Sequence, residues 1–209
     1  PNETILSKAL TNGLQVHLAF DETNGTTAHD SSGNNRYAEL HGVDGNGSTW
    51  VNGKIGNALN FDGVNDWGSV PTILDYDYSV AFWIKTTNSD YNATDSFDAP
   101  NGILVAEGST TGIFHNGGKI DLRVNKPNNE TRMSSQLNVS QDIWFHVVCV
   151  CNKYGNWETD FRIYINGIQD KYSGDNKKHY TTSGPLNLGR NTQVGGKHFQ
   201  GALDDFRIY

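Results

Sequence analysis

Apolar and polar side chains alternate with a period of two residues along much of this chain. Between residues 14 and 20 every second position is Leu, Val or Phe, and the positions between them are Gln, His and Ala. This alternation is typical of a half-buried strand. The segments 79–85, 143–151, 161–165 and 202–209 are rich in Val, Ile and aromatic residues. We expect these to be strands as well, with 79–85 more fully buried than the first.

Glycine-containing turns separate these apolar runs. Asn166-Gly167 stands between two of them and is a strong hairpin signal, because a type I′ turn needs positive φ at both central positions. Residues 115–119 predict a second hairpin. The polar stretches 88–101 and 125–136 are expected to be long loops, where binding residues often lie. Since no window shows sustained helical spacing, the pattern predicts an all-β sandwich or barrel in one domain.

Charge and composition argue against two classes of partner. The sequence has 16 Lys and Arg against 23 Asp and Glu, which gives a formal net charge of −7 at pH 7. A nucleic-acid-binding protein needs a basic surface to replace counterions, so we expect no nucleic-acid partner. No apolar run approaches the ~20 residues of a membrane-spanning helix, so we expect no membrane insertion.

The two cysteines give little information about redox compartment. Cys149 and Cys151 are two residues apart in an apolar run, so they share one face of the expected strand. Such neighbours lie at or beyond the Cα separation that an unstrained disulfide allows. We therefore expect two reduced, inward-facing thiols that react only after unfolding.

Seven short segments together suggest a family. They are Leu18–Gly25, Asp30–Asn34, Gly53–Gly63, Tyr78–Thr86, Trp144–Val147, Tyr164–Gly167 and Gly201–Tyr209. In this order they resemble the laminin-G-like (concanavalin A-like, pentraxin-like) jelly roll of secreted proteins, from about Gly13 to Tyr209. The resemblance implies an antiparallel two-sheet jelly-roll sandwich, with residues 1–209 as a single module of a larger secreted or cell-surface protein. It also places Phe82 and Trp83 in the core, so we interpret Trp83 as a packing residue.

The same resemblance implies one calcium ion near the junction of the first and last strands. The matching acids are Asp21 and Asp204, and Asn24 and Thr26 follow Asp21 in a turn that can curl round an ion. Calcium takes six to eight oxygen ligands, which these residue types supply. Asp205 is the reserve ligand if the strand faces are reversed. In the alternative interpretation, Asp21 and Asn24 cap a turn and Asp204 accepts a hydrogen bond from a backbone amide.

The fold that the resemblance implies also hosts glycoside hydrolases, so a suitably spaced pair of carboxyl groups would indicate an enzyme. These enzymes usually carry two carboxyl groups on one strand, as Glu-x-Asp-x-x-Glu, and a retaining pair lies ~5–5.5 Å apart. The nearest match begins at Glu158 and Asp160, but Ile163 stands where the second Glu is needed. We therefore expect a protein without catalytic activity.

Aromatic residues outside the core pattern point to a binding role. Tyr91 lies in the first long polar loop, and Trp157 lies at the tip between two expected strands. An exposed aromatic ring can pack on the apolar face of a sugar while polar side chains bind its hydroxyls. We predict a lectin-like, carbohydrate-binding module with structural calcium, whose partners are a glycan and other domains of the parent protein. The alternative is a structural or adhesin spacer without a sugar site, in which these aromatics fold back onto the sandwich edge.

Overall fold

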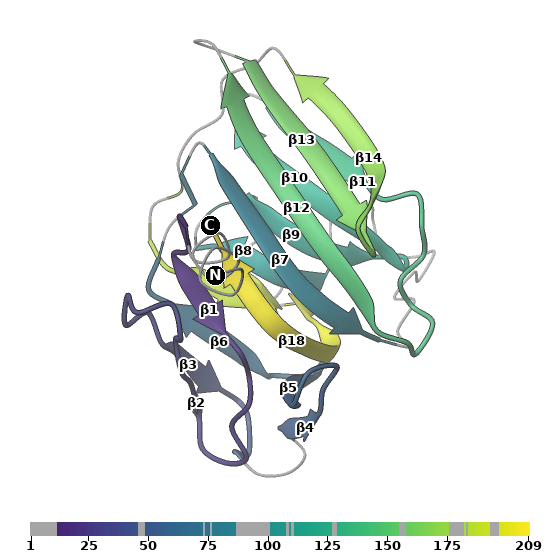
Figure 1. Cartoon of the computed structure of the whole chain (residues 1–209). Helices are drawn as coiled ribbons and strands as arrows, with labels where there is room; N and C mark the ends of the chain where they lie inside the picture. Colours follow the sequence, from purple (N-terminus) through teal and green to yellow (C-terminus); the bar gives the residue numbers. More distant parts are fainter. Residues whose placement is uncertain are drawn as a thin grey trace, which may run out of the picture.

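In the computed structural model the chain forms two antiparallel sheets that pack face to face (Figure 1). The predicted jelly-roll sandwich is therefore confirmed. No helix that could cross a membrane occurs in the part of the chain that the structure describes. The described residues are 12–45, 49–72, 74–75, 77–86, 101–107, 109, 111–126, 129–154, 158–175, 182, 184–192 and 197–209.

The first sheet has the strand order β14-β13-β12-β7-β18-β5-β4, and β1 pairs with β18 beside this path. The first and last strands of the chain are thus neighbours, with Val16 opposite Ile208. The strand bounds are β1 Val16–Leu18, β4 Trp50–Asn52, β5 Asn57–Asp62, β7 Tyr78–Lys85, β12 Phe145–Tyr154, β13 Glu158–Ile165, β14 Ile168–Asp175 and β18 Gln200–Ile208.

The second sheet has the order β11-β10-β9-β8-β15-β6-β3-β2, and a short ribbon of β16 and β17 stands apart from both sheets. In Figure 1 its strands β8, β9 and β10 lie behind β7 and β12 of the first sheet. The bounds are β2 Thr27–Ala28, β3 Ala38–His41, β6 Trp67–Val70, β8 Asn101–Ala106, β9 Gly112–Asn116, β10 Lys119–Lys126, β11 Asn129–Ser134, β15 Leu186–Leu188, β16 Arg190–Asn191 and β17 Lys197–His198.

The core lies between the sheets and follows the alternation of the sequence. Leu14, Val16, Leu18 and Phe20 are all buried, and the residues between them are not. Each inward strand face adds large apolar side chains, which supply most of the driving force for folding. The largest fully buried aromatic residues are Phe20, Phe61, Phe82, Phe114, Phe161, Phe199 and Phe206.

Both predicted hairpins are present. Asn166 and Gly167 have φ of 52° and 79°, and they connect β13 to β14 as a two-residue turn. Gly117 and Gly118 have φ of 57° and 78° and connect β9 to β10. Positive φ at both central positions matches the right-handed twist of the paired strands.

Two predicted boundaries were wrong. Residues 125–136 are not a long loop, because β10 continues to Lys126 and pairs with β11. Leu122 lies opposite Met133 in that pair, so a few inward apolar residues anchor strands whose sequence is mostly polar. Ile143 precedes β12 rather than belonging to it, and it is 53% exposed.

The interpretation of Trp83 as a packing residue was also wrong. Strand β7 alternates strictly, with Val80, Phe82 and Ile84 buried between the sheets. Trp83 therefore points to the outer face of the first sheet and is only half-buried. A long apolar run suggested burial on both faces, but in the described part of the structure the outer face of this strand leaves Trp83 only half-buried.

Cys149 and Cys151 behave as predicted. Both are free thiols, and both point inward from β12 with no exposed surface. Burial raises the pKa of Cys151 to about 12 and raises that of Cys149 further. Neither forms a reactive thiolate near neutral pH, so the pair serves as apolar filling.

Candidate ligand-binding groove

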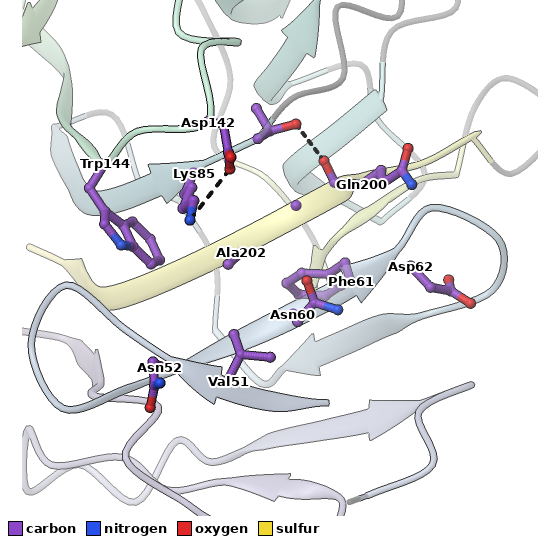
Figure 2. A pocket seen from close by; sticks show the side chains of 12 residues that line it. Val51, Asn52, Asn60, Phe61, Asp62, Lys85, Asp142, Trp144, Gln200 and Ala202 are labelled. Carbon is purple, nitrogen blue, oxygen red and sulfur yellow. Dashed lines mark hydrogen bonds and ion pairs between the residues drawn. The ribbon is translucent and has the colours of Figure 1, made fainter. Parts of the chain in front are cut away.

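A groove of about 580 Å³ lies on the outer face of the first sheet (Figure 2). It crosses β4, β5, β18 and β7, and the segment before β12 forms one side. Its lining combines one indole ring with several amide and charged side chains. The lining residues are Val51, Asn52, Asn60, Phe61, Asp62, Lys85, Thr86, Asp142, Trp144, Gln200, Gly201 and Ala202.

Strand register explains why polar residues line this face. Asn60 lies opposite Ala202, and Asp62 lies opposite Gln200, on the antiparallel pair β5 and β18. Phe61, between Asn60 and Asp62, points into the core, as does Leu203, the residue after Ala202. Because side chains alternate along each strand, the amides and carboxylate are presented together on the outer surface.

Gly201 lets the strands under the groove approach closely. Its φ is +145°, and an added Cβ would lie 2.7 Å from the carbonyl oxygen of Lys85 and 2.8 Å from the Phe199 ring. The hydroxyl of Thr86 donates a 2.7 Å hydrogen bond to the carbonyl of Gln200 across the same junction. A side chain at position 201 would therefore deform the groove.

Trp144 and an ion pair form the end of the groove nearest β12. The Lys85 ammonium lies 3.4 Å from Oδ1 of Asp142, and the Asp142 amide donates to the Thr86 carbonyl. Figure 2 shows this pair close to the Trp144 indole. Trp144 is half-buried, so part of its ring faces the solvent.

A second aromatic surface lies beside the groove. Trp83 is opposite His146 in the pairing of β7 with β12, and the two rings are 5.0 Å apart. The Lys54 ammonium is 5.1 Å from the Trp83 ring. We call Trp83, His146 and Lys54 the Trp83 platform. Burial lowers the pKa of His146, so its imidazole is neutral at pH 7 and can both donate and accept a hydrogen bond.

Two acids hold the turn that carries Lys54. Oδ2 of Asp204 accepts hydrogen bonds from the amides of Lys54 and Ile55, at 2.6 and 2.8 Å. Oδ1 of Asp21 accepts one from the amide of Asn57, at 2.9 Å. Gly56 has φ +64°, and a Cβ there would lie 1.9 Å from the Asp21 carboxylate. The turn therefore needs glycine at this position.

The structure thus brings Asp21 and Asp204 to one turn, while Asn24 and Thr26 lie apart from their carboxylates. The turn of Asn24 and Thr26 is exposed. The amide of its Gly25 donates to the Gly45 carbonyl, and the Gly25 carbonyl accepts a hydrogen bond from the indole N–H of Trp50. No three Asp, Glu, His or Cys side chains gather as a metal site in the described ranges. Calcium at the turn would need further oxygens from backbone carbonyls or water.

One atom at this turn fits a cation. Oδ1 of Asp204 is buried and accepts no hydrogen bond of ordinary geometry. Burial raises the pKa of Asp204, although the amides of Ile55 and Lys54 act in the opposite direction. A cation beside Oδ1 would offset the loss of hydration of this carboxylate.

Asp205, the reserve ligand, has other partners. Its Oδ1 lies 2.8 Å from Nε2 of His17 and 2.9 Å from the Arg207 guanidinium. Although burial raises the pKa of Asp205, these two partners more than offset that effect, and the pKa lies below its usual value. Asp205 has φ 47° within a bulge of β18, which turns its side chain to the outer face.

The remaining predicted site residues are placed as follows. Tyr91 and Trp157, the predicted sugar-binding aromatics, lie outside the described residues. In the candidate catalytic stretch, Asp160 is ion-paired with Arg162 and accepts a hydrogen bond from the Tyr172 hydroxyl. Ile163 is fully buried in the core.

Sequence reasoning missed the groove itself. Trp144 and Asn60 were noted only as parts of family segments, Lys85 was assigned to a strand without a role, and Gln200 was not singled out. One available signal was the parity of the strand that contains Phe82: if Phe82 is inward, Trp83 and Lys85 must point outward. The convergence of β5, β18 and β7 depends on a strand order that local patterns do not contain.

Solved structures with the same fold include binding domains. The chain matches the binding domain of Paraclostridial Mosquitocidal Protein 1 with a TM-score of 0.73 and 18% identity, covering 96% of this chain and 49% of that one. It therefore spans about half the length of that domain. Domain 4 of AbnA, an extracellular arabinanase from Geobacillus stearothermophilus solved with arabinotriose, matches with a TM-score of 0.61 and 21% identity. That match covers 94% of this chain and 91% of the other.

Other matches extend the range of proteins that share the fold. Domains LG4-5 of the mouse laminin alpha1 chain match with a TM-score of 0.55 and 12% identity, over 72% of this chain and 40% of that one. No curated protein sequence matches the chain. The laminin G model of the concanavalin A-like lectin/glucanases superfamily matches residues 61–209. Since this match spans more than two thirds of the sequence, the chain belongs to the laminin G family of that superfamily.

Proposed function

We propose that this chain is a carbohydrate-binding module without catalytic activity and that the groove on the first sheet holds the sugar. The observation that carries the proposal is the position of Trp144 beside Lys85, Asp142 and the amides of the groove. An apolar ring next to a few directed polar groups is the usual composition of a small-ligand site.

Each part of the groove has a chemical role in this proposal. The exposed part of the Trp144 ring packs against the C–H face of a sugar. The Lys85 ammonium donates to a hydroxyl oxygen, and the Asp142 carboxylate accepts from a hydroxyl proton. The amides of Asn52 and Asn60 can do both. A neutral sugar suits this set, because the nearest cation and anion already balance each other.

The comparisons support the proposal at the level of the fold. AbnA domain 4 was solved with arabinotriose, and the mosquitocidal protein match is a binding domain. We place the module in an extracellular protein with additional domains, in keeping with the extracellular arabinanase that contains domain 4. Nucleic acid and membrane lipid are not among the proposed partners, because the chain is acidic.

We further propose that calcium binds at the turn held by Asp21 and Asp204 and stabilises the module. Support comes from the buried Oδ1 of Asp204, which has no hydrogen-bond partner among the described residues. Asn24 and Thr26 would complete the ligand set if their exposed turn moved toward the ion. At 100 times its Kd, calcium would add about 2.7 kcal/mol to the free energy of unfolding. Equal melting temperatures in chelator and in millimolar calcium would contradict this part alone.

Binding to a printed glycan array tests the main proposal. The array carries mono-, di- and trisaccharides of arabinose, xylose, glucose, galactose and mannose, together with their polysaccharides. Wild-type chain is expected to bind at least one series, and Trp144→Ala to lose about tenfold or more in affinity. Tyr37→Ala serves as the control, since Tyr37 is 43% exposed and lies outside the groove. Absence of any bound glycan would favour a structural or adhesin spacer.

A further inference from the structure

The Trp83 platform and the groove occupy the same face of the same two strands. Trp83 and Lys85 both point outward from β7, and His146 points outward from β12. Trp144 lies immediately before β12 and lines the groove on the same face. In this register Phe145 lies opposite Ile84, and His146 lies opposite Trp83. Trp144 is therefore the diagonal neighbour of Trp83 on the adjacent strand.

This diagonal sets the spacing of the two indoles. Diagonal neighbours on paired antiparallel strands lie about 7–8 Å apart, within reach of large side chains. A sugar ring is comparable in size to an aromatic side chain, so two indoles at this spacing match two linked sugars better than one. Lys85, which lines the groove, lies two residues after Trp83 on β7, and continuing the register by one residue sets it opposite Trp144.

We propose that the Trp83 platform is a second sugar-binding subsite, so that the site takes a chain of two or more linked sugars running from Trp144 to Trp83. This inference rests on the proposed function of the groove. The imidazole of His146 is the hydrogen-bonding group of the subsite, since its ring lies 5.0 Å from the Trp83 ring and tilted by 50°. A tilted neighbour leaves more of the indole face open than a stacked one.

Lys54 covers this subsite when no ligand is bound. Its backbone is fixed, because Asp204 accepts hydrogen bonds from the amides of Lys54 and Ile55. Its side chain is long and flexible, and its ammonium rests over the Trp83 ring at 5.1 Å. A cation–π contact at a solvent-exposed site is weak enough for a sugar to displace. The displaced ammonium can then donate to a hydroxyl of the bound sugar.

The test compares chain lengths with matched variants. The whole chain is titrated calorimetrically with the mono-, di- and trisaccharide of each array series that binds. From mono- to disaccharide, affinity is expected to rise about tenfold or more. Trp83→Ala should remove this gain and leave monosaccharide affinity unchanged, and Trp83→Tyr should restore most of it. Tyr172→Ala, on the same sheet but at its β14 edge, should leave the whole series unchanged.

The outcomes separate the two proposals. If Trp83→Ala still binds longer saccharides more tightly, while Trp144→Ala binds saccharides of every length more weakly, the second subsite is wrong and the proposal for the groove stands. If wild-type chain shows no gain with length, the second subsite is also wrong. If no array sugar binds to wild-type chain, the proposed function itself fails. Melting temperatures of both Trp83 variants identify any loss of affinity that comes from unfolding.

Discussion

The outer faces of the two sheets carry half-buried tryptophans that are not equally available to a ligand. On the second sheet, Trp67 is stacked on His41 at 4.1 Å with the planes 16° apart, and the Arg190 guanidinium lies 3.4 Å from the ring centroid. Both faces of this indole are occupied. On the first sheet, Trp144 borders a groove, and among the described residues the ring neighbours of Trp83 are the tilted His146 and the flexible Lys54. Exposed area alone therefore does not identify a binding aromatic; the free ring face does.

The histidines of the two sheets differ in the same way. His115 of β9 has no exposed surface, and its Nε2 lies 2.8 Å from the Ser140 hydroxyl. His146 of β12 is half-buried on the outer face of the first sheet. His115 is thus part of the packing of the second sheet, whereas His146 stays at the surface of the first.

The largest expected effect concerns pH and His115. Burial lowers the pKa of His115 from 6.5 to about 4. The unfolded chain therefore binds a proton between these values that the folded chain does not. The corresponding stability is fully present above pH 6.5 and is lost as pH falls toward 4, by about 3 kcal/mol.

Urea unfolding at several pH values checks this prediction. His115→Gln should make the free energy of unfolding depend less on pH between 6.5 and 4. The control His29→Gln changes an exposed side chain and should leave this pH dependence as in wild type. An unchanged slope in His115→Gln would assign the acid sensitivity to other groups.

The next effect tests whether Trp67 is a packing residue. Trp67→Ala removes the contacts with His41 and Arg190 and should lower the free energy of unfolding by about 2–3 kcal/mol. Its affinity for any array glycan should equal that of wild type. A Trp67 variant that folds normally and binds more weakly would move the site to the second sheet.

On the first sheet, Asp204→Ala should lower the free energy of unfolding by as much as Trp67→Ala or slightly less. It leaves the amides of Lys54 and Ile55 without their acceptor, at a cost of about 1–3 kcal/mol. Asp204→Asn retains an acceptor oxygen and should cost less. Thermal unfolding measures both variants. If Asp204→Ala and Asp204→Asn lost the same amount of stability, the negative charge of Asp204 rather than its hydrogen bonds would stabilise the turn, as expected of a calcium ligand.

The smallest effect on stability is expected at the groove. Trp144→Ala should change the free energy of unfolding by less than about 1 kcal/mol, because the ring is not part of the core. Chemical denaturation of Trp144→Ala and Trp67→Ala under the same conditions measures the two losses of stability for direct comparison. A loss as large as that of Trp67 would make Trp144 a packing residue and remove the main argument for the groove.

The fold could be predicted because its determinants are local. Alternation between residues 14 and 20 marks a strand in any context, and Asn166-Gly167 favours one turn type for steric reasons. The inward position of Cys149 and Cys151 follows from the same parity. Errors arose where neighbours decide the outcome. Trp83 was placed in the core because a long apolar run can be covered on one face or on both.

The candidate site shows the limit of the sequence more clearly. The hydrophobic pattern predicted an all-β sandwich or barrel and which side chains of most strands point inward, and the family resemblance added the antiparallel two-sheet arrangement. It could not determine that β18 lies between β5 and β7, since this order depends on contacts far apart along the chain. Only that order places Asn60, Ala202 and Lys85 side by side, and the pairing of β7 with β12 sets Trp144 diagonal to Trp83. Function depends on these non-local contacts, whereas the strands themselves depend on local alternation and turn sterics.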